Sequence, residues 1–521
     1  MIASRVFSSI LKSHHRLSFW WFSLLFTVAI AAEETPITRI AFGSCANQSA
    51  PQPIWDAINN FDPQLFIWLG DNIYGDIRRP LKVIGKERTF GPWKNTPRFV
   101  PSSEEEMKLR YAKAKANPGY SSLQRKVKVI GTWDDHDYGL NDAGKEFDRK
   151  VTNQKLMLDF LDEPLDSPRR KQAGVYASYT YGPPNRKVKV IVLDTRYHRD
   201  PLRSDGSILG DTQWDWLEKE LRGPRSEITI IGSSVQVISN LSATTGPLFY
   251  MESWGRFPKE RKRLFKLISD TKRNGVIFIS GDVHFGEITR YDCSVGYPLY
   301  DVTSSGLVQS VEKVFPRPLH SIVRLLFWYT PSTMRVINDN CKFKSCTYGQ
   351  QNFGAISIDW NANPVIIRLE IRDVNGHTVL GTNVSLSELQ PGGSNSLKDA
   401  TTKGKSQRYC TLEIELPGLI RYRLAVLIYF TVAVLAMAIL GLIIGAILAI
   451  TACVYKCKRR ETRSLLRRIS SSLDLLHQIF VCIDRFSECT KSSEFEDFDK
   501  GDALYEARSK LALSCNQDQK L

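Results

Sequence analysis

The stretch VKVIGTWDDHD, residues 127–137, decides the fold class, because a strand-like apolar run ends there on three carboxylates and an imidazole. Five other runs share this layout, in which polar side chains follow an apolar strand directly. They are TRIAFGSC (38–45), QLFIWLGDNIY (64–74), VKVIVLDTR (188–196), ITIIGSSVQV (228–237) and GVIFISGDVH (275–284). Short Val- and Ile-rich runs separated by helical stretches are typical of buried parallel strands. We therefore predict an α/β sheet that collects a ligand at the carboxyl ends of its strands.

Helices are predicted between these strands from the period of the apolar residues. The predicted segments are 53–61, 102–116 with Ser102 as N-cap, 147–163, 211–223 and 257–274. The loop 77–100 shows no periodicity, and a loop of that size beside a strand-end site is often functional.

The C-terminal part of the head has a different pattern, with short alternating runs at 355–360, 365–373, 377–386 and 410–416. Such runs predict antiparallel strands. We expect them to form a second sheet packed on the first, and we expect the stretch 317–348 that precedes them to be irregular.

The 521 residues carry a net charge of +15, from 70 basic and 55 acidic residues. This excess suits a phosphate-bearing substrate or a membrane surface, although an ordinary basic surface would also account for it. The basic residues are scattered and form no nucleic-acid recognition module, so a nucleic-acid partner is not expected.

Two apolar segments predict the cellular compartment. Residues 1–31 read as a signal peptide, with basic residues before an apolar stretch that closes on Ala29-Ile30-Ala31. An uncleaved anchor is the alternative. The uncharged segment 424–455 is long enough to cross a bilayer of about 30 Å. Basic residues directly after it place the tail, 456–521, in the cytosol. We expect a single-pass type I membrane protein of the secretory pathway or plasma membrane, with its head, 38–416, in the lumen or outside the cell.

Cysteines and glycosylation motifs agree with this compartment. The head holds five cysteines, and without Cys45 the remaining four, Cys293, Cys341, Cys346 and Cys410, can pair in three ways. We expect Cys341 and Cys346 to lie close together. Of the Asn-x-Ser/Thr motifs in the head, those at Asn240 and Asn383 are predicted to lie in glycosylated surface loops. A glycan on Asn47 would crowd the strand end at Cys45.

Candidate metal ligands follow four of the strand-like runs. Asp71 and Tyr74 in GDNIY offer a carboxylate that can bridge two cations and a phenolate, although an Asp in this position is often only a helix cap. The run WDDHD would be strongly self-repulsive without a cation or substrate, and Asn141 adds a neutral oxygen of the kind Ca²⁺ accepts.

The last strand-like run ends on Asp282 and His284, which would point the same way from positions i and i+2 of a strand. Cys45 ends the first run. A free cysteine is commonly a small buried apolar residue, but this position favours a thiolate ligand.

The motifs GSC, GDNIY, WDDHDYGLND, LDTRYHR, LGDTQWDWL, GDVH and YDVTSSG occur in this order between residues 40 and 306. Together they resemble the alkaline phosphatase D, or PhoD-like, group of the calcineurin-like metallophosphoesterases. The resemblance implies a two-sheet α/β sandwich, here followed by a single transmembrane helix, and a site that holds Fe³⁺ with Ca²⁺. Compared with bacterial members, we expect no N-terminal accessory domain and an added membrane anchor.

Ligand chemistry divides the candidates into two sets. Cys45, Asp71, Tyr74 and His284 suit ferric iron, which favours anionic ligands. Asp71 (shared), Asp135, Asn141 and Asp282 offer only oxygen and suit Ca²⁺. A divalent ion such as Zn²⁺ or Mn²⁺ is the fallback.

Two cations that hold one phosphate would polarise it and lower the pKa of a bridging water, so that hydroxide attacks in line. His136 could contact the phosphoryl group or protonate the leaving group, or could instead only orient a ligand. Arg196 could hold the non-reacting oxygens, or could form a structural ion pair with Asp194.

The sequence therefore predicts a membrane-anchored phosphatase or phosphodiesterase that hydrolyses phosphate esters outside the cytosol. A receptor-like protein that uses the same fold only for binding is the alternative. Substrate identity, the preference for mono- or diesters, and oligomeric state do not follow from the sequence.

Overall fold

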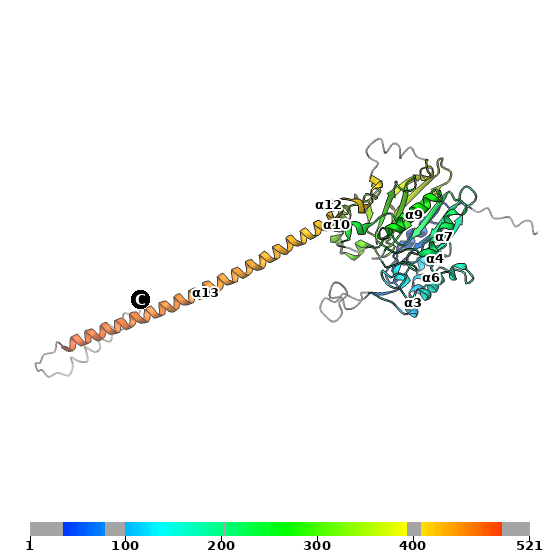
Figure 1. The fold of residues 1–521 in the computed structure, drawn as a ribbon. Coiled ribbons are helices and arrows are strands. Elements are labelled where there is room, and N and C mark those ends of the chain that lie inside the picture. The colour runs from blue at the N-terminus through cyan, green and yellow to red at the C-terminus, as the bar shows by residue number, and fades with distance from the viewer. Residues whose placement is uncertain are drawn as a thin grey trace, which may run out of the picture. The chain divides into compact units, whose positions relative to one another are not determined.

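A computed structural model describes residues 35–78, 99–201, 205–246, 248, 251–392 and 408–491 of the chain (Figure 1). The predicted signal peptide lies outside the described residues, as does most of the loop 77–100. The chain divides into two compact units, 1–429 and 430–521. The first unit contains both β-sheets and is the head described below.

The first sheet of the head has six strands in the order β15-β14-β13-β1-β2-β5. Its strands are β1 (Arg39–Gly43), β2 (Leu65–Leu69), β5 (Lys128–Thr132), β13 (Asn352–Asp359), β14 (Ile366–Asp373) and β15 (Thr378–Ser385). Strands β1, β2 and β5 run parallel, whereas β13, β14 and β15 are antiparallel to their neighbours.

The second sheet has seven strands in the order β12-β10-β11-β9-β8-β7-β6. Its strands are β6 (Ala177–Tyr181), β7 (Val188–Val192), β8 (Ile228–Ser233), β9 (Val276–Ser280), β10 (Gly286–Tyr291), β11 (Leu299–Ser304) and β12 (Thr347–Tyr348). Strands β7, β8, β9 and β11 are parallel neighbours. Two short strands, β3 (Ile77–Arg78) and β4 (Phe99–Val100), pair with each other apart from both sheets.

The two sheets share one apolar core. Ile67 of β2, Ile230 of β8 and Ile277 of β9 belong to a single buried cluster and are fully buried. A second cluster lies between the first sheet and its helices, with Phe66 of β2 and Trp55 of helix α2 (Ile54–Phe61) among its members. Two mixed sheets packed face to face with helices outside them confirm the predicted α/β sandwich.

The predicted distribution of strands between the sheets needs correction. The six strand-like runs are shared equally: β1, β2 and β5 lie in one sheet, and β7, β8 and β9 lie in the other. The antiparallel strands β13, β14 and β15 do not form a second sheet, because β13 pairs with β1 and extends the first one. The run 410–416 is not a strand and contains a 3-10 turn at Glu413–Glu415.

Helices form in the five predicted segments. They are α2 (Ile54–Phe61), α3 (Glu104–Lys115), α6 (Lys150–Phe160), α7 (Gly210–Arg222) and α9 (Pro258–Asp270), with shorter helices at α4 (Pro118–Gln124), α5 (Asp135–Tyr138), α8 (Leu241–Thr245) and α12 (Gly418–Arg421). The N-cap of α3 is Ser103 and not Ser102. Ser103 accepts a hydrogen bond from the Glu106 amide, and the Glu106 carboxylate accepts one in return from the Ser103 amide, which completes a capping box.

A further helix, α10 (His320–Tyr329), lies within the stretch that the sequence predicts to be irregular. Its residues HSIVRLLFWY are mostly apolar, and its polar face is narrow, because it consists only of His320, Ser321 and Arg324. The helix begins two residues after a proline, at the end of a short 3-10 turn.

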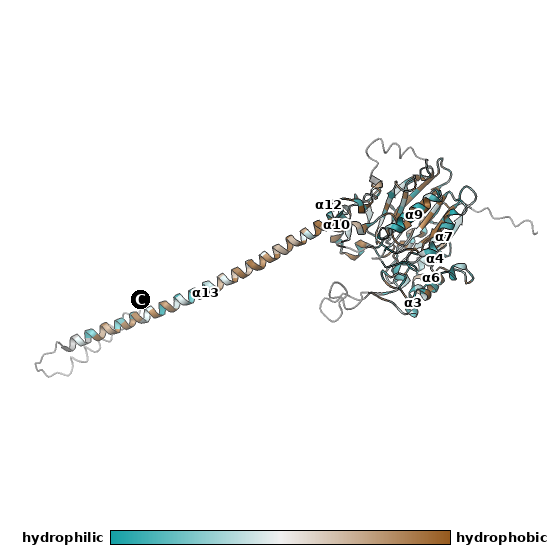
Figure 2. Ribbon diagram, viewed as in Figure 1, coloured by the Kyte–Doolittle hydropathy of each residue, from teal (hydrophilic) through white to brown (hydrophobic). Residues whose placement is uncertain are grey.

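Helix α13 runs without interruption from Arg423 to Lys491 and contains the predicted membrane-spanning segment. It is long and apolar enough to cross a membrane, with a mean hydropathy of 2.9 in its most apolar window. Figure 2 shows its first part as hydrophobic and its later part as mixed. The amphipathic stretch SLDLLHQIFVCIDRF (472–486) continues the same helix.

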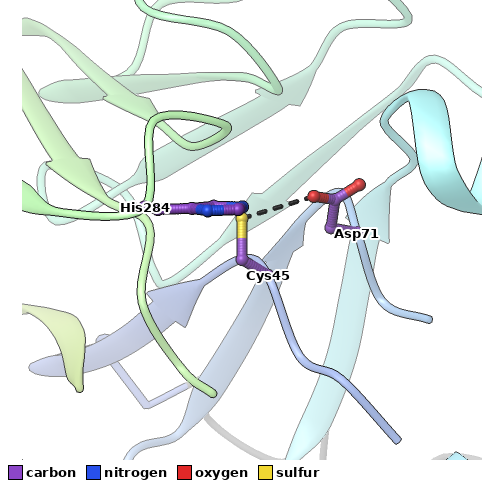
Figure 3. A group of neighbouring side chains, drawn as sticks. All are labelled: Cys45, Asp71 and His284. Carbon is purple, nitrogen blue, oxygen red and sulfur yellow. Dashed lines mark hydrogen bonds between the residues drawn. The ribbon is translucent and has the colours of Figure 1, made fainter. Parts of the chain in front are cut away.

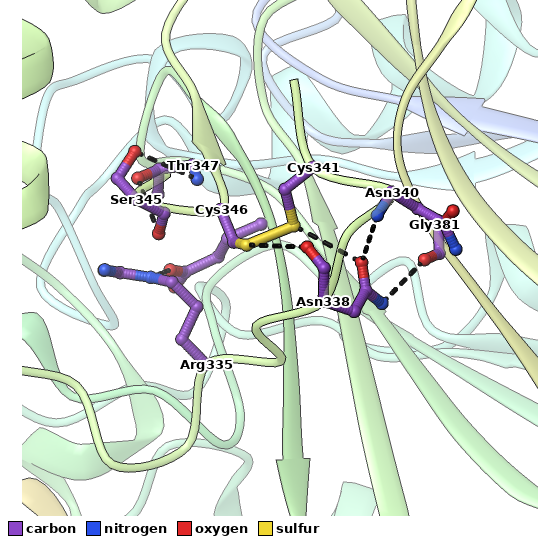
Figure 4. The surroundings of a disulfide bond; sticks show 9 residues. Arg335, Asn338, Asn340, Cys341, Ser345, Cys346, Thr347 and Gly381 are labelled. Carbon is purple, nitrogen blue, oxygen red and sulfur yellow. Dashed lines mark hydrogen bonds and ion pairs between the residues drawn. A yellow bond between two sulfur atoms is a disulfide. The ribbon is translucent and has the colours of Figure 1, made fainter. Parts of the chain in front are cut away.

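Two disulfides join the four head cysteines, Cys293 with Cys410 and Cys341 with Cys346. The second closes a short loop beside Asn338 (Figure 4). Cys45 is free and buried, as a metal ligand requires. The expected closeness of Cys341 and Cys346 is confirmed, with Cα atoms 5.1 Å apart.

The glycosylation motifs need correction. Asn240 is 5% exposed, and its amide group contacts Gly255 and Ser253, so this folded site has no room for a glycan. Asn383 is exposed but lies on the edge strand β15 and not in a loop.

Candidate metal centre

The predicted ligands gather where the carboxyl ends of strands from both sheets meet. Cys45, Asp71, Asp134 and Asp282 each stand two residues after the last residue of a strand, β1, β2, β5 and β9 respectively. An isolated bridge between Ser44 and Ser305 joins the two edges. The topology therefore brings together residues that lie more than 200 positions apart in the sequence.

The backbone at this edge is strained. Cys45, Asp71, Asp282 and His284 have φ angles of 64°, 49°, 70° and 62°, in the left-handed region that L-residues with side chains rarely adopt. Each such residue costs roughly 1–2 kcal/mol. Four such residues in one cluster reduce the local stability of the fold, and this backbone conformation sets the direction of their side chains.

Cys45, Asp71 and His284 form the first group of possible ligands, with one ligand atom of each within 4.8 Å of the others (Figure 3). The Cys45 Sγ lies 3.4 Å from the Asp71 Oδ2 and 3.1 Å from the Ser305 hydroxyl. The other carboxylate oxygen of Asp71, Oδ1, is buried and has no hydrogen-bond partner among the described residues. A bound cation would satisfy it.

Tyr74 lies beside this group. Its hydroxyl is 3.0 Å from the Nε2 of His284, and its ring packs on that of His136 with centroids 4.3 Å apart. Burial, and then the charges of Cys45 and Asp71, raise the pKa of the Tyr74 phenol well above its ordinary value. A phenolate at this position therefore requires a strong positive charge close by.

Asp71, Asp135 and His136 form a second group of possible ligands. Asp71 belongs to both groups, which agrees with its predicted bridging position. Asp135 accepts hydrogen bonds from the backbone amides of His136 and Asp142, both at 2.8 Å. Burial opposes its charge, but His136, Arg196 and these amides outweigh burial and lower the pKa of Asp135 to about 2.

His136 is 7% exposed, and its Nδ1 lies 2.7 Å from the Oδ1 of Asp76. Burial opposes its protonation, but the charges of Asp135, Asp71 and Asp76 raise the pKa of His136 well above its ordinary value. Sequence reasoning missed Asp76. Its only signal is its position two residues after Tyr74, at the start of the long loop.

Asp135, Asp142 and Glu252 form a third group, in which every donor atom is a carboxylate oxygen. Asp142 and Glu252 were not predicted. Asp142 stands next to Asn141 in the motif GLND, whereas Glu252 follows no strand and has no local signal. Glu252 forms ion pairs with Arg196 and Arg199, so its charge is already compensated.

Two predicted ligands stand somewhat apart from these groups. Asn141 is half-buried, and its backbone amide donates to Asp76. Asp282 belongs to none of the three groups among the described residues. Its pKa is raised well above the ordinary value, mainly by burial and further by the nearby charges of Asp134, Asp135 and Glu252. Asp282 and His284 do not follow strand geometry, because β9 ends at Ser280 and both residues have left-handed φ angles.

Arg196 is fully buried and forms ion pairs with Asp134 and Glu252. The predicted ion pair with Asp194 is wrong, because Asp194 instead accepts hydrogen bonds from the backbone amides of Arg196 and Tyr197. Asp134 also accepts a hydrogen bond from Ser234 at 2.8 Å. The Arg196 guanidinium thus already has two carboxylate partners.

A family model described as PhoD-like phosphatase matches residues 40–321, more than half of the chain. The chain belongs to the PhoD-like phosphatase family. Alkaline phosphatase D of Bacillus subtilis is 23% identical over 288 residues, which are 50% of this chain and 48% of that relative. The chain thus spans about half the length of the curated relative it matches.

Solved structures show looser similarity. The structure of PhoD matches 68% of this chain and 69% of its own chain, at 17% identity and a TM-score of 0.48. GAP50, the anchor in the inner membrane complex of Plasmodium, matches 67% of this chain and 89% of its own, at 11% identity and a TM-score of 0.41.

Family membership and the set of donor groups both indicate a metal site. PhoD-like phosphatases are metal-dependent, and thiol, carboxylate and imidazole groups meet here around an unpartnered carboxylate oxygen. Burial, with neighbouring carboxylates, raises the pKa values of Asp71 and Asp282 well above the ordinary range. The residues therefore fit a positively charged group, since one would relieve this repulsion.

Proposed function

We propose that this protein is a membrane-anchored, metal-dependent phosphoesterase that hydrolyses phosphate esters on the lumenal or extracellular side of its membrane. The observation that carries the proposal is the unpartnered, buried Oδ1 of Asp71 between two groups of possible metal ligands. Membership of a phosphatase family supports the reaction class.

In this proposal Cys45, Asp71, Tyr74 and His284 would hold Fe³⁺. Asp71 and Asp135 would hold Ca²⁺. The candidate further oxygen donors are Asp282, Asn141, Asp142 and Glu252. In a second arrangement, both positions hold Zn²⁺ or Mn²⁺. When bound, two such cations polarise a phosphoryl oxygen and supply a water of lowered pKa.

The chain's own side chains would then position the phosphate ester and protonate its leaving group. His136 is held by Asp76 through Nδ1, which fixes the ring orientation and favours the protonated form. Its other nitrogen, Nε2, is the atom that would donate to a phosphoryl or leaving-group oxygen. Arg196 would act indirectly, because it holds Asp134 and Glu252 in place around the site.

The membrane assignment rests on helix α13, which is long and apolar enough to span, and on the basic residues that follow the apolar segment. The basic cluster favours a cytosolic tail and therefore a head on the opposite side. Two disulfides in the head suit an oxidising compartment.

The test is hydrolysis by the purified full-length protein, assayed with p-nitrophenyl phosphate and bis-p-nitrophenyl phosphate, with and without a chelator. We expect turnover of at least one ester that the chelator abolishes and that Fe³⁺ with Ca²⁺, or Zn²⁺ or Mn²⁺, restores. A metal-loaded protein that hydrolyses neither ester would favour the receptor-like alternative.

A further inference from the structure

A cavity of about 430 Å³ opens beside the proposed metal centre. Glu252, Asp282 and His284 contribute to one part of its wall, and apolar side chains such as Leu241 and Phe285 form most of the rest. Small-molecule sites typically have volumes of about 300–1,000 Å³. The space next to the phosphate-binding residues therefore suits a hydrocarbon group.

Helix α10 supplies much of the apolar wall, through Val323, Leu326 and Phe327. Phe327 packs edge-on against Phe285, with ring centroids 5.1 Å apart, and Phe285 directly follows the predicted ligand His284. Two consecutive residues, His284 and Phe285, therefore link the proposed metal centre to the apolar wall of the cavity.

A second side of α10 is also apolar and faces outward, next to the narrow polar face that contains Arg324. Ile322, Leu325 and Trp328 are 52%, 55% and 55% exposed in the described head. A helix that is apolar on both sides is expected where both sides contact apolar surroundings. One side of α10 lines the cavity, and a lipid bilayer would cover the other.

The start of α13 joins the same wall. Leu424 lines the cavity, and the neighbouring Arg423 donates a hydrogen bond of 2.6 Å to the carbonyl of Tyr329, the last residue of α10. The uncharged segment that can cross a membrane begins at Leu424 itself. Chain connectivity therefore keeps the cavity within a short distance of the membrane surface.

We propose that the cavity holds the hydrocarbon chain of a phosphate-ester lipid drawn from the membrane that anchors the protein. The lipid phosphate would face Asp71 and His284 while its chain lies between α10 and Phe285. This inference rests on the proposed phosphoesterase function and specifies its substrate class. It explains why apolar walls adjoin a site that must bind an anion.

The inference is tested with p-nitrophenyl methyl phosphate and p-nitrophenyl octyl phosphate, which carry the same leaving group and differ in the chain. The full-length protein is held in nanodiscs of phosphate-free galactolipid, so that no bilayer lipid competes. Each buried methylene contributes up to about fourfold in kcat/KM. We expect the octyl ester to be preferred by about a hundredfold or more, and equal kcat/KM values would overturn the inference.

Two neighbouring leucines give a matched pair of variants. Leu326→Trp fills the cavity and should lower the octyl-to-methyl ratio of kcat/KM by about tenfold or more. Leu325→Trp changes the exposed side of the same helix and should leave this ratio as it is in the wild type. Equal ratios in the two variants would show that the chain does not lie in this cavity.

Binding of phosphonates separates this inference from the proposed function, because a phosphonate is not hydrolysed. Calorimetry with octylphosphonate and methylphosphonate should show much tighter binding of the octyl compound by wild type but not by Leu326→Trp. If that result came with no ester hydrolysis, the proposed function would fail while the lipid cavity stood. Equal binding of both phosphonates would overturn the cavity assignment whatever the turnover.

Discussion

Two buried carboxylates at neighbouring strand ends, Asp134 and Asp71, differ in how their charge is compensated. Asp134 is paired with Arg196 and accepts a hydrogen bond from Ser234. Asp71 has no ion pair with a Lys or Arg among the described residues, and this is the difference, because each residue has one buried oxygen (Asp71 Oδ1 and Asp134 Oδ2) without a hydrogen-bond partner there. Both residues are essentially excluded from solvent, at 0% and 1% exposure.

The contrast distinguishes a structural charge cluster from a functional one. Removing a carboxylate from water costs several kcal/mol unless a cation and hydrogen bonds compensate it. The Asp134 cluster supplies its own cation in Arg196, whereas the Asp71 cluster has only His136 close by. A fold keeps such an uncompensated cluster when a cation from outside completes it.

The largest effect that follows from this contrast is on turnover. Asp71→Asn removes the negative charge shared by both ligand groups while keeping a residue type that tolerates a left-handed φ. We expect kcat/KM for phosphate-ester hydrolysis to fall by about a thousandfold or more. Steady-state assays of metal-loaded protein measure it.

Asp62→Asn is the matched control, because Asp62 has a φ of 52°, close to that of Asp71, and its side chain is 79% exposed on the surface. This variant should keep wild-type turnover. Near-normal turnover in Asp71→Asn would instead show that the shared carboxylate has no part in the reaction.

The next effect is on stability and concerns the other cluster. Arg196→Met leaves Asp134 buried without its cation and leaves Glu252 with Arg199 alone, which should destabilise the protein by about 3–5 kcal/mol. Arg39→Met breaks the exposed pair with Asp62 and should cost at most about 1 kcal/mol. Denaturant unfolding of both variants checks the difference, and similar losses in the two would contradict the structural role of Arg196.

The candidate site was partly predictable, because its candidate ligands obey a local rule. Cys45, Asp71, Asp135 and Asp282 follow apolar strands directly, and strand ends in α/β folds face the ligand. Their approach in space could not be derived from the strand pattern alone, since β1, β2 and β5 belong to one sheet and β9 to the other.

Other parts of the site and the fold do not follow a local sequence pattern of this kind. Glu252 lies in an irregular segment and reaches the site only through tertiary packing, so no spacing in the sequence marks it. Helix α10 was missed because it is short and its polar face holds only His320, Ser321 and Arg324, which weakens the periodic signal. Strands β13–β15 were recognised, but they join the first sheet through the pairing of β13 with β1, a contact between segments about 300 residues apart.

Removing the metal should make the stability of the protein depend more strongly on pH, because the buried carboxylates of the Asp71 cluster then lack a compensating cation. Burial raises the pKa values of Asp71 and Asp282 well above their ordinary range. A carboxyl whose pKa is higher when folded stabilises the fold at low pH, and this contribution is lost as pH rises through the folded pKa.

We therefore expect the melting temperature of chelator-treated protein to fall as the pH rises from about 5 to about 8, because these carboxyls are already ionised in the unfolded chain over this range. Metal-loaded protein should lose less stability over this range, because the cations compensate the carboxylates. Differential scanning calorimetry at matched ionic strength measures both. Parallel pH profiles with and without metal would contradict a cation-requiring cluster.

The smallest effect concerns Tyr74. Its hydroxyl lies 3.0 Å from His284, and a phenolate on ferric iron gives charge-transfer absorption in the visible range. Tyr74→Phe should weaken or shift that band with little loss of stability, about 1 kcal/mol. Cys45→Ser should change a different part of the spectrum. A colourless active protein without iron would leave Zn²⁺ or Mn²⁺ as the metal.

Metal content per chain tests the central claim most directly. Elemental analysis of purified wild type, Asp62→Asn and Asp71→Asn, each dialysed against metal-free buffer, reports how many ions the cluster retains. We predict two ions per chain in wild type and Asp62→Asn, and at most one in Asp71→Asn, because Asp71 belongs to both ligand groups. Equal metal content in all three proteins would contradict a bridging Asp71 and the metal centre built on it.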